Sequence, residues 1–344
     1  MKAETLLPLG KLDPGLRATE TPLDLNDVVA QAGIADAVGY HAVLMEETKD
    51  DPFQVLAMAA GATTRVHVGT SVAIAFARSP YVTAQAAWTA QKISAGRFEL
   101  GLGSQVRGHI RRRFGMEWHP PGPWMRDYVR AVKAIWQSWQ TQKPLAFESE
   151  HYNLNLNVPL FTPAPIECPA IPIQVGAVNP YMAKVAAEVA DGVRLHPVCS
   201  PRYIEQVIVP AVTGVRHEKF EICLKPLIAA AADEQTLRAR KGVARERLAF
   251  YMSTPAYAGA FEVYGLGGLC ADMAELSKAG KWHALAALVS DEIFDACVVV
   301  ALYEDLAAII NERYGNLLQR IEMSIPVASA ADKEQLADVI EAIR

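Results

Sequence analysis

Four short stretches of the chain place glycines, small residues and polar side chains where a ligand could bind. They are Met45-Glu-Glu-Thr-Lys-Asp-Asp-Pro52, Gly69-Thr-Ser-Val72, Gly101-Leu-Gly-Ser-Gln105 and Gly176-Ala-Val-Asn-Pro180. Small residues let a flat ring approach the backbone, and free N–H groups at the start of a helix bind phosphate. Carboxylates can transfer protons. Each stretch alone also fits a solvated loop, a packed strand or a helix cap.

The acidic stretch offers two neighbouring carboxylates. Glu46 and Glu47 cannot both point into a site, because successive residues of a strand face opposite ways. His196 closes a different apolar segment, in a position suited to catalysis or to contact with a ring. A lone histidine is more often structural, so both interpretations of His196 stay open.

The glycine-rich stretch could contribute both backbone and side chains to a site. Gly103 permits close approach of a ligand to the backbone, and Ser104 and Gln105 supply hydrogen bonds. A basic run follows directly: Arg107, His109, Arg111, Arg112 and Arg113. Arg107 and Arg111 share one face at helical spacing and could bind an anion, although such a run is more often a solvated helix face.

Other kinds of site are not indicated. The five cysteines are scattered and never form a CxxC pair, and His41, His67 and the remaining histidines lack metal-ligand spacing within one helix. No serine or cysteine triad can be recognised. The sequence therefore predicts neither a metal site nor a disulfide framework.

The elements that must position these residues alternate between short apolar strands and longer helices, which is typical of βαβ units. Eight strands are expected, at Ala3–Leu9, His41–Met45, Val66–Ile74, Arg97–Leu102, Ile171–Val175, Gly192–His196, Phe220–Ala229 and Leu318–Ile325. Four helices begin with an Asp, Ser or Asn followed by proline, at Asp51, Ser79, Asn179 and Ser200. We expect an α/β fold, a (β/α)8 TIM barrel in which the ligand-binding residues lie at the carboxyl ends of the strands.

The expected barrel spans residues 1–344 as one domain, with an insertion at about 141–170 between strands four and five. A doubly wound sheet is disfavoured because no glycine fingerprint follows the first strand. The segment 251–303 cannot be assigned from its pattern.

Composition limits the partners. The chain is 51% hydrophobic and carries 33 Lys and Arg against 38 Asp and Glu, a net charge of -5. This balance offers no global attraction to nucleic acid or to an anionic membrane. The first residues do not form a signal peptide, and no apolar run reaches the roughly 20 residues of a spanning helix. We expect a cytoplasmic protein with a small-molecule substrate.

The chain resembles the luciferase-like monooxygenase superfamily, and within it the oxidoreductases that use the deazaflavin coenzyme F420. Four stretches carry the resemblance: Gly39-Tyr-His-Ala-Val-Leu-Met-Glu-Glu47, Arg65-Val-His-Val-Gly-Thr-Ser-Val72, Ser94-Ala-Gly-Arg-Phe-Glu-Leu-Gly-Leu-Gly-Ser104, and Pro172-Ile-Gln-Val-Gly-Ala-Val-Asn-Pro180 with Ala190-Asp-Gly192. The resemblance implies a homodimer and a cis peptide at Ser71-Val72 beside the cofactor ring. It also implies a phosphate site at Gly176, Ala177 and Val178.

One departure bears on the reaction. The sugar-phosphate dehydrogenases of this superfamily have Asp-His where this chain has Glu47-Thr48. The resemblance therefore argues against sugar-phosphate oxidation, and makes Glu47 the residue expected to face the mouth as an acid or base. Thr48 beside it is a second catalytic candidate.

Three functions follow from the resemblance. The first is hydride transfer between coenzyme F420 and a small organic substrate. The second is a reduced-flavin (FMN) monooxygenase that needs a separate reductase. The third is a flavin-binding barrel without turnover.

Overall fold

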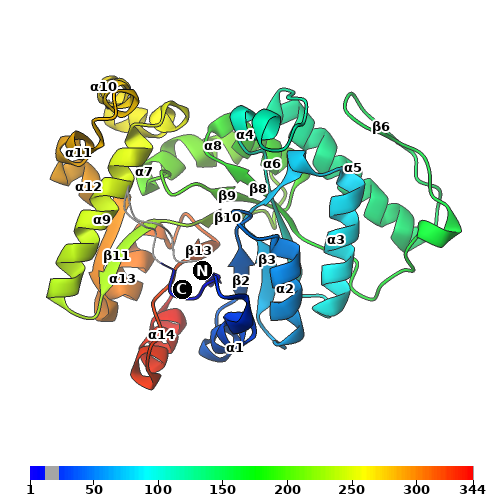
Figure 1. Ribbon diagram of the computed structural model, residues 1–344, viewed down its shortest axis with the longest axis horizontal. Coiled ribbons are helices and arrows are strands. Elements are labelled where there is room, and N and C mark those ends of the chain that lie inside the picture. Colours follow the sequence, from blue (N-terminus) through cyan, green and yellow to red (C-terminus); the bar gives the residue numbers. More distant parts are fainter. Residues whose placement is uncertain (12–22, 344) are drawn as a thin grey trace.

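A closed barrel of eight parallel strands forms the centre of the molecule (Figure 1). The computed structural model describes residues 1–11 and 23–343. The barrel strands are β1 (Lys2–Leu6), β2 (Ala42–Met45), β3 (His67–Thr70), β5 (Phe98–Gly103), β8 (Ile173–Ala177), β9 (Gly192–Leu195), β10 (Glu221–Leu224) and β13 (Arg320–Glu322). They pair in the order β3-β2-β1-β13-β10-β9-β8-β5, and pairing of β3 with β5 closes the barrel. The predicted (β/α)8 barrel is confirmed.

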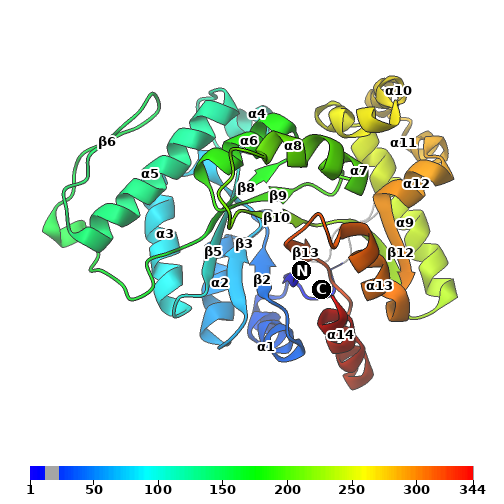
Figure 2. The same ribbon diagram turned by 180° about the vertical axis from the view of Figure 1, so that it is seen from behind.

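Helices surround the barrel (Figures 1 and 2). They include α1 (Val28–Val38), α2 (Pro52–Gly61), α3 (Pro80–Ile93), α5 (Pro121–Thr141), α6 (Pro180–Val189), α7 (Pro201–Tyr203), α8 (Val209–Val212), α13 (Tyr303–Tyr314) and α14 (Ala330–Ala342). The side chains of Asp51, Ser79, Asn179 and Ser200 each accept a hydrogen bond from a backbone N–H in the first turn. These four predicted caps are confirmed, and they begin α2, α3, α6 and α7 close to the strand ends.

The insertion between the fourth and fifth barrel strands is also confirmed. It contains the short antiparallel pair β6 (Phe147–Glu148) and β7 (Asn153–Leu154) and the 3-10 turn Pro159–Phe161. Both views show the β6 segment projecting away from the barrel (Figures 1 and 2).

A second, larger insertion between β10 and β13 was not predicted. β11 (Leu227–Ala231) and β12 (Val298–Leu302) form a separate two-stranded parallel sheet. Between them lie α9 (Glu234–Met252), the 3-10 helix Pro255–Tyr264, α10 (Gly267–Lys278), α11 (Trp282–Leu285) and α12 (Asp291–Cys297). Both views place this lobe on the side opposite the β6 segment.

The second insertion corrects one strand boundary. The single strand expected over Phe220–Ala229 is wrong, because the chain leaves the barrel between Leu224 and Leu227. Pro226, which lies in this gap, has no N–H to donate to a ladder. The residues after it pair with β12 instead of with the barrel.

Charged side chains fill part of the barrel interior. Glu4 of β1 accepts hydrogen bonds from Arg194 of β9 at 3.0 Å and from Arg320 of β13 at 2.8 Å. Arg320 also binds Glu99 of β5 at 2.5 Å. Breaking a buried pair costs about 3–5 kcal/mol, because one charge is left uncompensated. The network therefore holds Arg194 firmly below the carboxyl ends of the strands.

Among the described residues, no helix is both long and apolar enough to cross a membrane.

Candidate active site

A cavity of about 850 Å³ opens at the carboxyl ends of the barrel strands. Residues from several strand ends and from the second insertion line it: Lys11, Glu46, Thr48, Lys49, Ser71, Val72, Gly103, Ser104, Gln105, Val106, Pro121, Gly176, Ala177, Val178, Asn179, Met182, Arg194, Leu195, His196, Pro197, Lys225, Arg247, Tyr251, Ala256 and Tyr257. The three glycine-containing stretches named from the sequence, which begin at Gly69, Gly101 and Gly176, all contribute residues to this cavity, although they lie far apart in the chain.

The third strand forms one wall of the cavity. The predicted cis peptide at Ser71-Val72 is confirmed, and it lies between β3 and β4 (Ala73–Ile74). A Cβ added to Gly103 would lie 2.5 Å from Cγ2 of Val72, closer than real Cβ atoms approach. Only glycine therefore leaves Val72 in its place on this wall. Ser104 and Gln105 follow on the same wall, and Gln105 adopts a φ of 55°.

The start of α6 forms a second wall. Gly176, Ala177 and Val178 lead from β8 into this helix, and the Asn179 side chain accepts a hydrogen bond from Met182 N–H at 2.9 Å. Tyr203 Oη donates a hydrogen bond to the Val178 carbonyl at 3.1 Å, and this bond holds the connection between β8 and α6 in place. The first turn of a helix carries a partial positive charge, so this wall favours an anionic group.

Glu46 and Glu47 face opposite ways, as expected, but Glu46 and not Glu47 is the one that faces the cavity. Glu47 is absent from the cavity lining: its carboxylate accepts hydrogen bonds from Ile74 N–H at 2.6 Å and from Arg78 at 2.5 Å. Glu46 lines the cavity instead. The expectation that Glu47 faces the mouth is therefore wrong. The physical reason is that β2 ends at Met45, and Arg78 and the backbone after the cis peptide capture the second carboxylate.

Two lysines hold Glu46 in place. Lys11 Nζ lies 2.7 Å and Lys225 Nζ 3.2 Å from its two carboxylate oxygens. Burial alone would raise the pKa of Glu46, but the charges of Lys225 and Lys11 lower it to about 2. Glu46 is therefore ionised throughout the neutral range.

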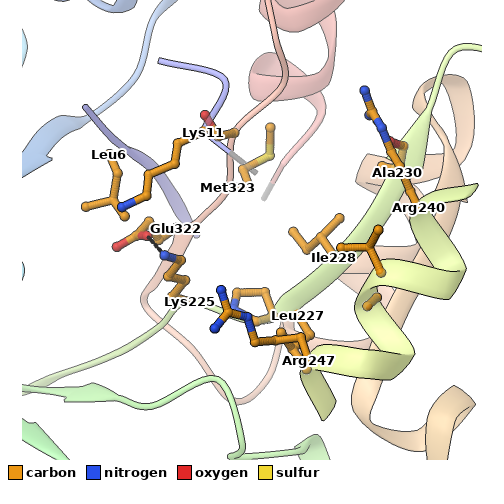
Figure 3. Close-up of a pocket in the computed structure, with 14 residues that line it drawn as sticks. Leu6, Lys11, Lys225, Leu227, Ile228, Ala230, Arg240, Arg247, Glu322 and Met323 are labelled. Atoms are coloured by element: carbon orange, nitrogen blue, oxygen red, sulfur yellow. Dashed lines mark hydrogen bonds and ion pairs between the residues drawn. The ribbon is translucent and has the colours of Figure 1, made fainter. Parts of the chain in front are cut away.

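Glu322 is a second carboxyl beside this group, and it behaves differently. It lies on β13, 3.8 Å from Lys225 Nζ, and accepts a hydrogen bond from Ser71 Oγ at 3.3 Å. Burial raises the pKa of Glu322 to about 7. Figure 3 shows Glu322 facing Lys225 at a smaller cavity of about 130 Å³, with Arg247 on the same side. Lys11, Lys225 and Arg247 line both cavities.

His196 lies in the cavity between two tyrosines. Its ring centroid is 4.9 Å from that of Tyr251 and 4.3 Å from that of Tyr257. Val198 N–H donates to His196 Nδ1 at 3.3 Å, so in the neutral ring the proton resides on Nε2. The candidate Thr48 also lines the cavity, and its carbonyl accepts a hydrogen bond from Arg113 at 2.9 Å.

Arg107 and Arg111 lie on α4 (Arg107–Arg112), outside the cavity lining and exposed. The helix begins directly after Val106, which does line the cavity. Anion binding by these two arginines stays a prediction.

The comparison with known proteins decides the family. The sequence profile of the luciferase-like monooxygenases matches residues 7–319. The chain belongs to the luciferase-like monooxygenase family. Members of this family are oxidoreductases and monooxygenases.

Individual relatives and solved structures are similar to this luciferase-like chain. An uncharacterized protein of Mycobacterium tuberculosis is 37% identical over 322 residues, which is 92% of this chain and 94% of the relative. The solved structure of the coenzyme F420-dependent tetrahydromethanopterin reductase of Methanopyrus kandleri has a TM-score of 0.73 at 18% identity, with 99% and 97% of the two chains covered. The oxygenating constituent of 3,6-diketocamphane monooxygenase from Pseudomonas putida, solved with FMN, has a TM-score of 0.64 at 15% identity, with 99% and 96% covered. These two structures share the fold.

The sequence reasoning missed the cationic residues of the luciferase-like cavity. Arg194 Nε and Nη2 are buried and have no hydrogen-bond partner. A charged residue within the apolar segment Gly192-Val-Arg-Leu195 was a usable signal, because such a residue is rarely buried without a role. Arg247 and Tyr251 share a face of α9 at i, i+4 spacing, but nothing in the sequence shows that this face meets the barrel.

Proposed function

We propose that this chain is an oxidoreductase that transfers hydride between coenzyme F420 and a small organic substrate. The cationic lining of the cavity carries this proposal. Among the described residues that line it, five are cationic, Lys11, Lys49, Arg194, Lys225 and Arg247, and one is acidic, Glu46. Coenzyme F420 has an acidic lactyl-oligoglutamate tail beyond its phosphate, whereas FMN ends at the phosphate. The lining therefore favours the more anionic cofactor.

The residues present fit a flat, phosphorylated ring. Ser71, Val72 and Gly103 would border the ring, because the glycine leaves that wall free of a side chain. Gly176, Ala177 and Val178, with the start of α6, would hold the phosphate. Arg194 has two buried nitrogens without partners, which an anionic group in the cavity could satisfy. When bound, the cofactor supplies the hydride chemistry.

The side chains of the cavity then bind and orient the substrate and move protons. His196 can donate the Nε2 proton to a substrate oxygen, since its Nδ1 is held by Val198 N–H. Tyr251 and Tyr257 pack against the imidazole and shield it from water on two sides. Glu46 stays ionised and keeps Lys11 and Lys225 in position, so we assign it to electrostatic positioning.

The experiment that tests this proposal titrates the purified chain with coenzyme F420 and with FMN at two or more salt concentrations. We expect F420 to bind more tightly at low salt, with the difference shrinking as salt rises, because exposed ion pairs are screened. Tighter binding of FMN at every salt concentration would overturn the proposal and support the reduced-flavin monooxygenase.

Oxygen uptake separates the two reactions. A hydride-transfer enzyme reoxidises reduced F420 with an organic acceptor under anaerobic conditions, whereas a monooxygenase consumes oxygen with reduced FMN and a reductase. Binding without any reoxidation would support a flavin-binding barrel without turnover.

A further inference from the structure

A second group of ionisable side chains lies at the amino ends of the barrel strands, opposite the cavity. His41 immediately precedes β2, His67 is the first residue of β3, and Glu99 is the second residue of β5. These three strands are neighbours in the barrel. The group therefore joins the starts of three adjacent strands and takes no part in the site described above.

The three side chains converge on one point. His67 Nδ1 lies 2.9 Å and His41 Nε2 3.6 Å from the same oxygen, Oε1 of Glu99. One nitrogen or oxygen of each residue lies within 4.8 Å of the other two. A zinc ion binds nitrogen and oxygen at about 2.0–2.2 Å, so its tetrahedral ligands lie about 3.3–3.6 Å apart. A single ion would need only small side-chain movements here.

Two nitrogens of this group make no hydrogen bond of good geometry, although both lie beside the Glu99 carboxylate. His41 Nε2 and His67 Nδ1 are buried, and neither makes a hydrogen bond of acceptable geometry. The two rings are stacked with centroids 4.7 Å apart, which fixes both nitrogens toward Glu99. Arg320 binds the other Glu99 oxygen, Oε2, so Oε1 faces only the two histidine nitrogens among the ion pairs of the described residues. A cation between the three atoms would satisfy all of them, and buried polar atoms nearly always have a partner.

The surroundings do not oppose a cation. Lys2 is paired with Glu221 at 3.0 Å and Arg65 with Asp36 at 3.5 Å. Arg320 is compensated by three carboxylates, those of Glu4, Glu99 and Glu221. A cavity of about 440 Å³ is lined by both histidines, next to the buried nitrogens.

We propose that His41, His67 and Glu99 form a binding site for one divalent first-row transition metal ion such as Zn²⁺, with water completing the coordination. Two imidazoles and one carboxylate are a ligand set that such ions prefer, and Mg²⁺ and Ca²⁺ are poorly served by it. The ion would link three strands at the end of a barrel where residues serve stability. Sequence spacing gave no sign of it, because each ligand comes from a different strand.

The test uses the full chain without an affinity tag, first stripped with a chelator and then titrated with Zn²⁺ or Co²⁺. We expect one equivalent to bind, visible absorption bands from bound Co²⁺, and a rise in Tm of about 3–6 °C when free Zn²⁺ is 100 times its Kd. Mg²⁺ should leave Tm unchanged. None of these measurements needs the cofactor, so failure here is distinct from failure of the proposed function.

Two variants locate the ion. His41→Asn and His67→Asn should each weaken Zn²⁺ binding by more than about tenfold, while His283→Asn, an exposed histidine of α11, should bind as the unaltered chain does. In the unaltered chain, ¹⁵N-histidine spectra should show two of the eight histidines shifting on addition of one equivalent of Zn²⁺. Absence of binding, or equal Zn²⁺ binding by a variant that carries both His41→Asn and His67→Asn, would overturn the proposal and leave a histidine–carboxylate ion-pair cluster.

Discussion

The carboxylate of Glu47 lies 2.5 Å from Nη1 of Arg78, behind the wall of the cavity, while the adjacent Glu46 faces into it. Arg78 also binds Asp51 at 3.0 Å, so it connects the end of β2 to the start of α2. Two consecutive glutamates therefore have separate tasks, one in the scaffold and one at the cavity.

Substitution of these two glutamates separates the tasks. Glu47→Gln should lower the free energy of unfolding by about 1–3 kcal/mol, because a charge-assisted hydrogen bond is lost and Arg78 keeps Asp51 as its remaining carboxylate partner among the described residues. Cofactor affinity should stay within about threefold, since the side chain does not reach the cavity. Glu46→Gln is the matched comparison, and it should change the cofactor Kd and its salt dependence. Denaturant unfolding and a binding titration check both. A Glu47→Gln protein of normal stability that has lost only turnover would contradict this assignment.

Gly103 is expected to be essential to the wall that borders the ring. An added Cβ would lie 2.5 Å from Val72 Cγ2, so Gly103→Ala must push Val72 toward the cavity. We expect cofactor binding to weaken by about tenfold or more, in line with a typical overpacking cost of about 1–3 kcal/mol. Gly108→Ala in α4 is the control, because the nearest atom to its Cβ is the flexible Arg112 side chain at 3.4 Å. Equal binding by both variants would rule out close packing at this wall.

Glu322 should make the protein less stable as pH rises. Its pKa is about 7 in the folded protein, above the value of 4.5 that a free glutamate has, so the folded state binds the proton more tightly. The contribution of Glu322 to the free energy of unfolding is therefore complete below about pH 4.5. It is lost as the pH rises to about 7, with an upper limit of about 3 kcal/mol. Glu322→Gln should remove this decline and be the more stable protein at pH 8.

Thermal unfolding from pH 4.5 to 8.5 measures the effect. Glu304→Gln, which changes an exposed glutamate of α13, should retain the decline of the unaltered chain. Parallel curves for Glu322→Gln and the unaltered chain would show that Glu322 is ionised in the folded state across this range.

His196 should affect turnover more than binding. His196→Gln removes the imidazole between Tyr251 and Tyr257 and should lower kcat by about 10²–10⁴-fold, the typical effect of a lost general acid. The Kd of the cofactor should change by less than about threefold. Pre-steady-state reduction and a separate binding titration distinguish these quantities. Loss of cofactor binding with an unchanged rate of hydride transfer would make His196 a binding residue.

The strand and helix pattern was sufficient to predict the barrel, because alternation of apolar strands with capped helices is encoded locally. Asp51, Ser79 and Asn179 cap helices just as their position before proline predicts. The break at Pro226 also has a local cause, but the apolar residues on both sides of this proline led to the prediction of one continuous strand. Leu227–Ala231 could join the barrel or pair with β12. The choice depends on contacts with residues 71 positions later in the chain, and no local sequence pattern contains this information.

The candidate site was predictable only in part. Ser71, Gly103 and Gly176 were recognisable because their stretches together resemble the luciferase-like family, although each stretch alone also fits a loop, a packed strand or a helix cap. The orientation of Glu47 was not, since the alternation rule holds within a strand and β2 ends before Glu46. Lys225 and Arg247 reach the cavity from segments whose placement is set by the second insertion.

The lobe formed by β11, β12 and α9 gives the molecule a modular character. Arg247 and Tyr251 of α9, with Tyr257 just beyond it, form cavity wall, whereas Ser71, Gly103 and Gly176 belong to the barrel. Replacing the lobe would thus alter what the cavity admits while leaving the ring-bordering and phosphate-facing walls intact. Natural variation, or a designed chimera, could diversify substrate range through this one insertion without rebuilding the barrel beneath it.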